Sequence, residues 1–220
     1  MTAAELRALI PVDWLVALDG NLPETELQQL ARALSDERRV VLPPREQWFR
    51  ALDETPLSEV RAVILGQDPY PTQGQAEGVA FSVPDGVLPV PPSLRRILRE
   101  AEREATIAPG RTSLLQWARR GVLLLNAALT VPEGTAGGHA TIGWQPVTDA
   151  ILRAIGSQPG PVVFMPWGAH ARAAVRRAGS RTATHPVPVR SPDGAPRWVH
   201  RIGPIRVRER PAARYRTGAD

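Results

Sequence analysis

Potentially reactive side chains follow a short apolar segment in the first third of the chain. Val63–Leu65 is an uninterrupted apolar run that predicts a buried strand, and Gly66 ends it with a turn. Gln67, Asp68 and Tyr70 come directly after the turn. Proteins of the α/β class build active sites at the carboxyl ends of such strands. Asp68 is therefore a candidate catalytic carboxylate, although a lone Asp-Pro pair is explained equally well by a turn.

Two other polar side chains stand at the ends of predicted strands. Asn126 follows the apolar run Val122–Leu125, and His185 follows the last predicted strand. Taken singly, Asn126 fits a turn and His185 fits a surface histidine before a proline. The carboxyl ends of parallel strands meet at one edge of a sheet, however. Asp68, Asn126 and His185 together therefore favour a shared pocket.

Predicted strands and helices alternate along the chain. Apolar runs predict strands at residues 60–65, 122–125 and 162–165, and a fourth just before His185. Helical spacing or helix-ending residues predict helices at 26–34, 93–104, 112–120, 145–155 and 169–178, and another after the Pro43–Pro44 loop. This alternation predicts a single α/β domain with a central, mostly parallel four-stranded sheet flanked by helices.

The composition excludes several kinds of chemistry. The 220-residue chain has no cysteine, so it contains neither disulfides nor a cysteine nucleophile, and all 27 basic residues are arginine, which excludes a lysine Schiff base. A net charge of +5 is compatible with a nucleic-acid partner and equally with a solvated basic surface. No apolar run reaches membrane-spanning length and no secretory leader is visible, so we expect a cytoplasmic protein that does not enter a membrane.

Several motifs, in the same order, resemble those of family 1 uracil-DNA glycosylases. They are G-Q-D-P-Y at 66–70 with G-V-A-F-S-V at 78–83, V-L-L-L-N-A-A-L-T-V at 122–131, and H-P-V-P at 185–188. P-P-S at 91–93 is similar to the family's proline-rich DNA loop, and W-G-A-H at 167–170 also fits. The resemblance covers roughly residues 10–188. It implies the glycosylase fold and a monofunctional enzyme, without lyase activity, that hydrolyses the N-glycosidic bond of a flipped-out deoxyuridine in DNA.

The resemblance also implies which residues would carry the chemistry. Asp68 would stabilise the cationic sugar and orient or deprotonate the attacking water. His185 would donate a hydrogen bond to O2 of the departing uracil anion, which is oxyanion-type stabilisation. Gln67 would help to hold the water and the uracil. No metal or other cofactor is required by this mechanism, and the chain shows no clear metal-ligand cluster.

Three further side chains would select the base, if the resemblance holds. Phe81 would stack on the flipped uracil. Asn126 would pair with the N3–H and O4 groups of uracil and reject cytosine. The ring of Tyr70 would occupy the space beside C5, where thymine carries its methyl group.

The resemblance places DNA contacts on two loops. Residues near the flipped nucleotide would bind phosphates independently of sequence: Pro91, Pro92 and Ser93. A second loop would hold the duplex open: Pro186, Val187, Pro188 and Val189. Arg172, Arg176 and Arg177 could add affinity, although a solvated helix face explains them better. The expected partner is uracil-containing DNA, single- or double-stranded, and we expect a monomer.

The end of the chain departs from the family pattern. We interpret residues 1–188 as the glycosylase-like domain and residues 189–220 as an atypical tail, rich in arginine and proline and predicted to be poorly ordered. Val189 is small for the apolar wedge that fills the vacated base position. Our hypothesis is a shifted reading frame, because dropping one nucleotide near codon 187 permits a reading with G-F-I-G-S-A-P-F-G-S-A-N, which resembles the family ending.

Two other functions remain open from the sequence. The altered tail favours a protein that binds DNA or uracil but has impaired or lost cleavage, whereas the retained Asp68 and His185 favour the enzyme. A different nucleotide-processing α/β enzyme is the third alternative, which the ordered motifs disfavour.

Overall fold

A parallel sheet forms the centre of the molecule, as the alternation of elements predicts. The computed structural model describes residues 1–103, 108 and 110–177. Its central sheet consists of β2 (Ala62–Gly66), β3 (Val122–Asn126) and β5 (Val163–Pro166), paired in the order β3-β2-β5 with both pairs parallel. The α/β prediction and three of the four strands are confirmed. The strand predicted before His185 lies outside the described residues.

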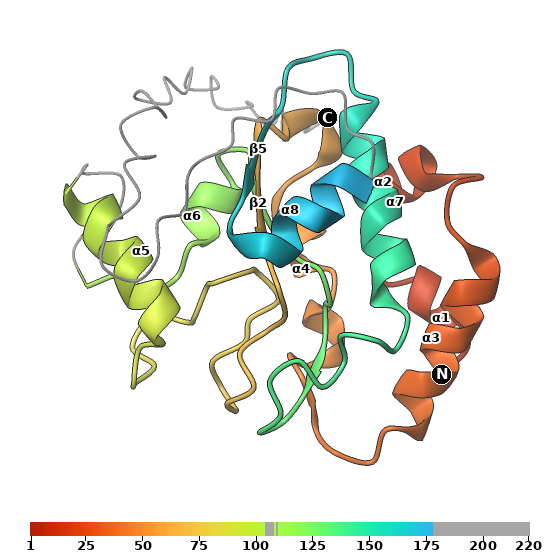
Figure 1. The fold of residues 1–220 in the computed structure, drawn as a ribbon, viewed down its shortest axis with the longest axis horizontal. Coiled ribbons are helices and arrows are strands. Elements are labelled where there is room, and N and C mark those ends of the chain that lie inside the picture. The colour runs from red at the N-terminus through yellow and green to blue at the C-terminus, as the bar shows by residue number, and fades with distance from the viewer. Residues whose placement is uncertain (104–107, 109, 178–220) are drawn as a thin grey trace, which may run out of the picture.

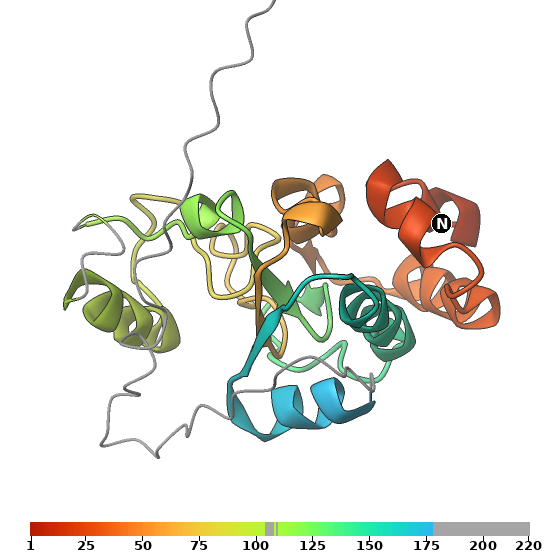
Figure 2. The ribbon, with the colours of Figure 1, turned by 90° about the horizontal axis from the view of Figure 1, so that it is seen from above.

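Both faces of the sheet are buried. Alternate residues of each strand point to opposite sides, so each face contributes side chains to a different apolar core. Val63 and Leu65 of β2 join one apolar core, whereas Ile64 between them joins the other. The helices α5 (Pro92–Arg103) and α6 (Leu115–Ala118) cover the face that carries Ile64. The helices α7 (Trp144–Gly156) and α8 (Gly168–Arg177) lie on the opposite side, and Figures 1 and 2 show this division into layers.

The first 60 residues add a helical layer to the larger core. This layer contains α1 (Ala3–Arg7), α2 (Val12–Leu18), α3 (Glu24–Asp36), α4 (Arg50–Glu54) and two single turns, η1 (Arg45–Gln47) and η2 (Leu57–Glu59). Trp14 of α2 is fully buried, and its indole N–H donates to the carbonyl groups of Leu52 and Thr55. The helix predicted at 26–34 is confirmed as α3, and the helix expected after Pro43–Pro44 is confirmed as η1 and α4.

One predicted helix is much shorter in the structure. We predict residues 112–120 as a helix, but α6 begins only at Leu115. The Asp85 carboxylate accepts hydrogen bonds from the backbone N–H groups of Thr112 (2.8 Å) and Ser113 (3.0 Å). These bonds hold the two residues in an extended loop, so they do not enter the helix.

A small antiparallel pair that local patterns do not predict lies beside the main sheet. It joins β1 (Val41–Leu42) to β4 (Val131–Pro132), with Leu42 opposite Val131. Through this pair the chain that leaves β3 is held against the N-terminal layer, and the loop that follows β4 starts from there. No helix in the described residues is long and apolar enough to cross a membrane.

Candidate active site

The site begins where β2 and β3 end side by side. Gly66 is the register partner of Asn126, so the turn after β2 starts next to the Asn126 side chain. A Cβ atom on Gly66 would overlap with Asn126 Oδ1 and lie 3.2 Å from the Ala80 side chain. Glycine is therefore required at this position by close approach. Asn126 itself is buried, at 7% exposure, so its amide faces the protein interior at the carboxyl end of the sheet.

The turn after β2 is held by backbone hydrogen bonds to the chain leaving β3. The N–H of Ala127 donates to the carbonyl of Gly66 (3.0 Å), and the N–H of Ala128 donates to that of Gln67 (3.0 Å). The two chains thus stay paired beyond the ends of their strands. Gln67 is exposed here, whereas Asp68 is half-buried.

Asp68 is fixed by a residue that follows β4. Its Oδ2 atom accepts a hydrogen bond from the backbone N–H of Gly137 at 2.5 Å. Within the described part of the chain, Oδ1 of Asp68 has no hydrogen-bond donor. One carboxylate oxygen is therefore used for positioning, and the other is available to a water molecule or a developing positive charge.

Tyr70 joins the turn to two other segments of the site. Its hydroxyl group donates to the backbone carbonyl of Phe81 (3.4 Å) and shares a hydrogen bond with the hydroxyl of Ser93 (2.8 Å). Burial raises the pKa of Tyr70 above its ordinary value, while the hydrogen bond with Ser93 acts in the opposite direction. The phenol therefore stays protonated at neutral pH.

Phe81 has an unusual backbone conformation. Its φ is +64°, and among the described residues it is the only non-glycine residue with a positive φ. Its ring centre lies 5.1 Å from that of Trp167, with the rings tilted by 51°. Trp167 directly follows β5, so the third strand end also contributes to the site. Two aromatic rings thus meet at the same edge of the sheet as Asn126.

The predicted DNA loop lies at the start of α5. Pro92 is the first residue of the helix, and Pro91 just before it is buried, whereas Pro92 and Ser93 are exposed. The side chain of Gln75 donates to the carbonyl of Pro89 (3.0 Å) and so ties this loop to the chain after Tyr70. The contact between Ser93 and Tyr70 brings the exposed loop to the rim of the candidate pocket.

Of the six predicted catalytic and substrate-binding residues, five lie around these strand ends. The five are Gln67, Asp68, Tyr70, Phe81 and Asn126. The predicted residues His185, Pro186, Val187, Pro188 and Val189 lie outside the described residues. Gly137 and Trp167 are not among the predicted site residues. The W-G-A-H motif at 167–170 contains Trp167, but the contact of its ring with Phe81 depends on the tertiary fold.

The arginines of α8 differ from one another. Arg177 is exposed, and its guanidinium forms an ion pair with the buried carboxylate of Asp149 on α7 (3.1 Å). Arg172 and Arg176 are exposed as well. The ion pair between α7 and α8 therefore accounts for Arg177 without DNA, and a contribution of the three arginines to DNA affinity stays a prediction.

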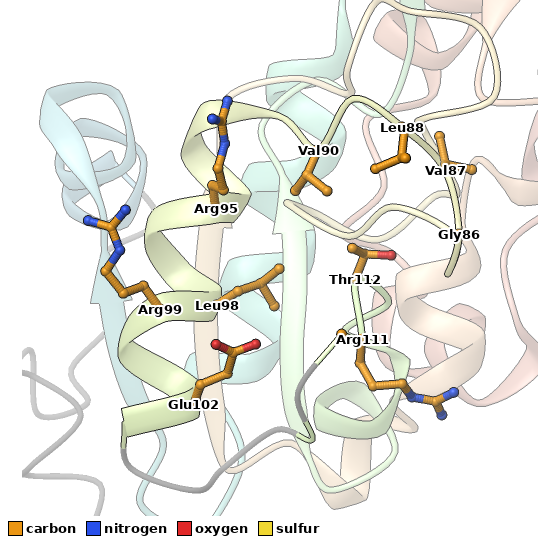
Figure 3. A pocket seen from close by; sticks show the side chains of 11 residues that line it. Gly86, Val87, Leu88, Val90, Arg95, Leu98, Arg99, Glu102, Arg111 and Thr112 are labelled. Atoms are coloured by element: carbon orange, nitrogen blue, oxygen red, sulfur yellow. The ribbon is translucent and has the colours of Figure 1, made fainter.

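A separate hollow of about 500 Å³ lies between α5 and residues 86–90, and Gly110–Thr112 complete its lining. Figure 3 shows Leu98 pointing into this hollow, whereas the guanidinium groups of Arg95 and Arg99 point away from it. The candidate catalytic residues do not line it. Within the described residues, no group of histidine and acidic side chains is arranged to hold a metal ion.

The fold and the arrangement of strand ends define a known class of protein. The model of the Uracil DNA glycosylase superfamily matches residues 52–210. Since this match covers more than half of the chain, the protein belongs to the uracil DNA glycosylase superfamily.

Individual relatives support the assignment. A protein named uracil-DNA glycosylase from Sinorhizobium medicae is 47% identical over 190 residues, which cover 82% of this chain and 78% of the relative. A protein of the same name from Oleidesulfovibrio alaskensis is 50% identical over 173 residues, covering 74% and 73% of the two chains.

Solved structures share the fold. The mimivirus uracil-DNA glycosylase superposes with a TM-score of 0.66 at 28% identity, covering 78% of this chain and 66% of the viral chain, slightly less than two thirds. A variant of mimivirus UNG in complex with UGI superposes with a TM-score of 0.72 at 29% identity, covering 83% and 73%.

Proposed function

We propose that this protein excises uracil from DNA by hydrolysing the N-glycosidic bond of a flipped-out deoxyuridine, which leaves an abasic site for base excision repair. The observation that carries the proposal is the shared edge of the sheet. There Asn126 lies beside Gly66 at the ends of β3 and β2, with Asp68 two residues further on. Tyr70 and Phe81 are hydrogen-bonded to each other close by.

Base recognition follows from the side chains at this edge. A base inside a duplex is out of reach, so it must leave the stack before its glycosidic bond can be attacked. The ring of Phe81 is braced by Trp167 and can stack on the extruded base. The buried amide of Asn126 offers a donor and an acceptor to O4 and N3–H of uracil, a pattern that cytosine does not match. The Tyr70 ring excludes the methyl group of thymine.

Cleavage of the glycosidic bond produces a cationic sugar and a uracil anion, and the chain supplies one group to stabilise each of them. The carboxylate of Asp68, held by Gly137, stabilises the cationic sugar and orients the attacking water. His185 is the proposed donor to the uracil anion, and a well-aimed donor of this kind is worth about 3–4 kcal/mol. The chain contains no lysine that could form a Schiff base, so the product remains an abasic site rather than a cleaved strand.

The proposed partner is uracil-containing DNA, bound mainly through its phosphates. Ser93 stands at the exposed start of α5, and its hydroxyl also contacts Tyr70. A phosphate bound at Ser93 would therefore lie beside the base pocket. We also propose that the protein works as a monomer in the cytoplasm, as the sequence leads us to expect.

The direct test uses single- and double-stranded oligonucleotides with one uracil, and matched strands with cytosine or thymine. We expect abasic sites only in the uracil strands. The Asp68→Asn variant keeps an oxygen for the Gly137 N–H but loses the charge, so its excision rate should fall at least about a hundredfold. Its melting temperature should stay close to that of the unmodified chain.

The same assay separates the alternatives. Tight binding of uracil-containing strands by the unmodified chain without release of uracil would support a binding protein that has lost cleavage. Absence of both binding and excision would refute the proposal. If excision persists in the Asp68→Asn variant, the proposed activity stands but Asp68 is not its catalytic carboxylate.

A further inference from the structure

A buried carboxylate lies in the loop between Tyr70 and Phe81. Glu77 is only 4% exposed, yet it belongs to none of the strand ends that form the site. Its Oε1 atom accepts hydrogen bonds from the hydroxyls of Ser82 and Ser113, the latter at 3.1 Å. Arg50 of α4 donates to both Oε2 and the backbone carbonyl of Glu77, each at 3.2 Å. Three separate segments of the chain therefore converge on this carboxylate.

The hydrogen bonds of Ser82 extend this network to the segment before α6. Its hydroxyl proton points to Glu77, and the same oxygen accepts the backbone N–H of Leu114 at 2.7 Å. A buried charge is costly unless it is paired and fully hydrogen-bonded. Arg50, Ser82 and Ser113 meet this requirement for Glu77. Loss of any one of them leaves a buried polar group without its partner.

The hydrogen bond between Glu77 and Ser82 closes a small loop around Phe81. The loop is fixed from outside as well, because the N–H of Ala51 donates to the carbonyl of Gly78 (3.2 Å) and the N–H of Ala80 donates to that of Leu124 (3.0 Å). A Cβ atom on Gly78, whose φ is +80°, would overlap with the carbonyl oxygen of Gln47. The loop is therefore pressed between α4 and β3.

Phe81 needs such support because its backbone conformation is unfavourable for a side-chain-bearing residue. Such strained conformations persist only where several surrounding contacts hold the backbone in place. The residue next to Phe81 is Ser82, which Glu77 and Leu114 hold from two sides. The carboxylate thus acts directly on the peptide segment that sets the direction of the Phe81 ring.

We infer that Glu77 is a positioning residue for the base platform: its hydrogen bonds to Ser82, Ser113 and Arg50 hold Phe81 at φ +64° with its ring against Trp167. Its relevance to uracil rests on the proposed function, since Phe81 is the proposed stacking ring. Glu77 holds the Phe81 ring in place whether or not a ligand is bound.

Fluorine NMR tests whether Glu77 positions the Phe81 ring, and it requires no activity assay. The chain has three phenylalanines, Phe49, Phe81 and Phe164, so fluorophenylalanine labelling gives three resonances. The Phe81→Leu variant identifies the resonance of Phe81. In the Glu77→Gln variant we expect this resonance to shift or broaden, because the ring moves relative to Trp167, while that of the buried Phe164 stays in place.

A control variant distinguishes displacement of the Phe81 ring from a general loss of stability. Glu54 also pairs with Arg50 (3.4 Å) and is mostly buried, but it does not contact the loop. The Glu54→Gln variant should lose stability without moving the Phe81 resonance. Ser82→Ala, which keeps the carboxylate, should move the resonance as Glu77→Gln does, and it replaces that variant if Glu77→Gln does not fold.

Uracil binding tests the functional part. We expect Glu77→Gln to weaken the binding of free uracil about tenfold, a part of what a stacked aromatic ring contributes. In a Phe81→Ala background the same substitution should have no further effect, because residues that act through one another are not additive. A full tenfold loss in that background, or an unmoved Phe81 resonance in a destabilised Glu77→Gln variant, would overturn the inference. If the unmodified chain binds no uracil while the resonance still moves, the proposed function fails and the positioning role stands.

Discussion

The backbone N–H of Gly137 donates a hydrogen bond to Oδ2 of Asp68 over 2.5 Å, although the two residues are 69 positions apart in the chain. A hydrogen bond to a charged acceptor is stronger than one between neutral groups, so it fixes the carboxylate firmly. The φ of Gly137 is +73°, a conformation in which glycine has no steric cost. The orientation of the proposed catalytic group therefore depends on the backbone of a distant loop.

Gly137→Ala should slow the chemical step more than it weakens binding. An L-residue at this φ costs about 1–2 kcal/mol, which the loop can relieve by rotating its N–H away from Asp68. We expect kcat to fall about tenfold, the worth of one hydrogen bond to a charged group, with KM for uracil-containing DNA nearly unchanged. Single-turnover excision assays and substrate titrations measure the two quantities.

Gly134→Ala is the matched control for this prediction. Gly134 has a φ of +72° and an open space around its missing Cβ, but it does not contact Asp68. Both variants should lose similar stability, and only Gly137→Ala should lose kcat. Equal losses of kcat in the two variants would mean that loop strain alone, rather than the bond to Asp68, accounts for the effect.

Gly66→Ala should damage the uracil pocket from within the sheet. Its Cβ would overlap with Asn126 Oδ1, so the amide must rotate or the strands must separate. We expect a loss of about 1–3 kcal/mol in the free energy of unfolding, typical of overpacking. The displaced amide should also reduce kcat/KM on uracil-containing DNA at least about tenfold, through one lost hydrogen bond.

Gly121→Ala provides the comparison at the other end of the same sheet. Gly121 precedes β3, has a φ of +88°, and a Cβ there would overlap with the carbonyl oxygen of Glu59. It should destabilise the fold without changing kcat/KM per folded molecule. Chemical denaturation and excision assays on both variants test this, and a Gly66→Ala variant with full activity would show that the Asn126 amide tolerates the displacement.

The strand ends could be predicted from sequence because their signals are local. The apolar run of β2 stops at Gly66 just before Gln67 and Asp68, and that of β3 stops at Asn126. The parallel arrangement of the two strands brings Asp68 and Asn126 to one edge. The contact between Gly137 and Asp68 has no such local signal. It arises because β1 and β4 pair and hold the loop after β4 in place, and two-residue strands give almost no pattern.

Other parts of the site depend on tertiary contacts in the same way. The positive φ of Phe81 could not be predicted from its residue type, because a phenylalanine rarely adopts this backbone conformation. We attribute it to the neighbouring Ser82, whose hydroxyl donates to the Glu77 carboxylate and accepts from the backbone N–H of Leu114. Likewise, Asp85 shortens α6 from 27 positions away, a distance over which helical propensity carries no information.

His139 introduces a pH dependence close to the loop that holds Asp68. Its ring is buried between Thr130 and Glu37: Nδ1 lies 2.8 Å from Thr130 Oγ1, and Nε2 lies 3.3 Å from Glu37 Oε2. A carboxylate acceptor requires the proton on Nε2, so Nδ1 accepts from the Thr130 hydroxyl, which in turn accepts the indole N–H of Trp144. Burial lowers the pKa of His139 below 6.5, while Glu37 acts in the opposite direction and Arg39 in the same direction as burial.

The sign of the effect follows from the lowered pKa. As pH falls below about 6.5, the unfolded chain takes up a proton at this histidine and the folded chain does not. Stability is therefore fully present above that pH and declines below it, by at most about 1.4 kcal/mol per pH unit. Urea denaturation between pH 7.5 and pH 5 should show a shallower decline for His139→Gln, in which the other histidines are unchanged. Parallel curves for the two proteins would exclude His139 as the source.

Another prediction concerns the chain after His185. If residues 189–220 are read in a shifted frame, the coding DNA around codon 187 must contain an alternative frame that encodes the sequence resembling the family ending. Sequencing of that DNA decides this directly. A coding sequence whose other frames are interrupted or encode no such pattern would rule out the hypothesis and make the tail a genuine feature of the protein.

The same region predicts a preference among substrates. A duplex must be unstacked and held open, whereas a single strand already presents its bases, so a small wedge residue should slow excision mainly from duplexes. We expect faster excision from single-stranded than from double-stranded uracil substrates, and a severalfold gain for Val189→Leu on duplexes alone. Val187→Leu, which adds the same volume two residues earlier, is the control. Equal rates on the two substrates, or a gain for Val189→Leu on single strands as well, would show that Val189 does not occupy the wedge position.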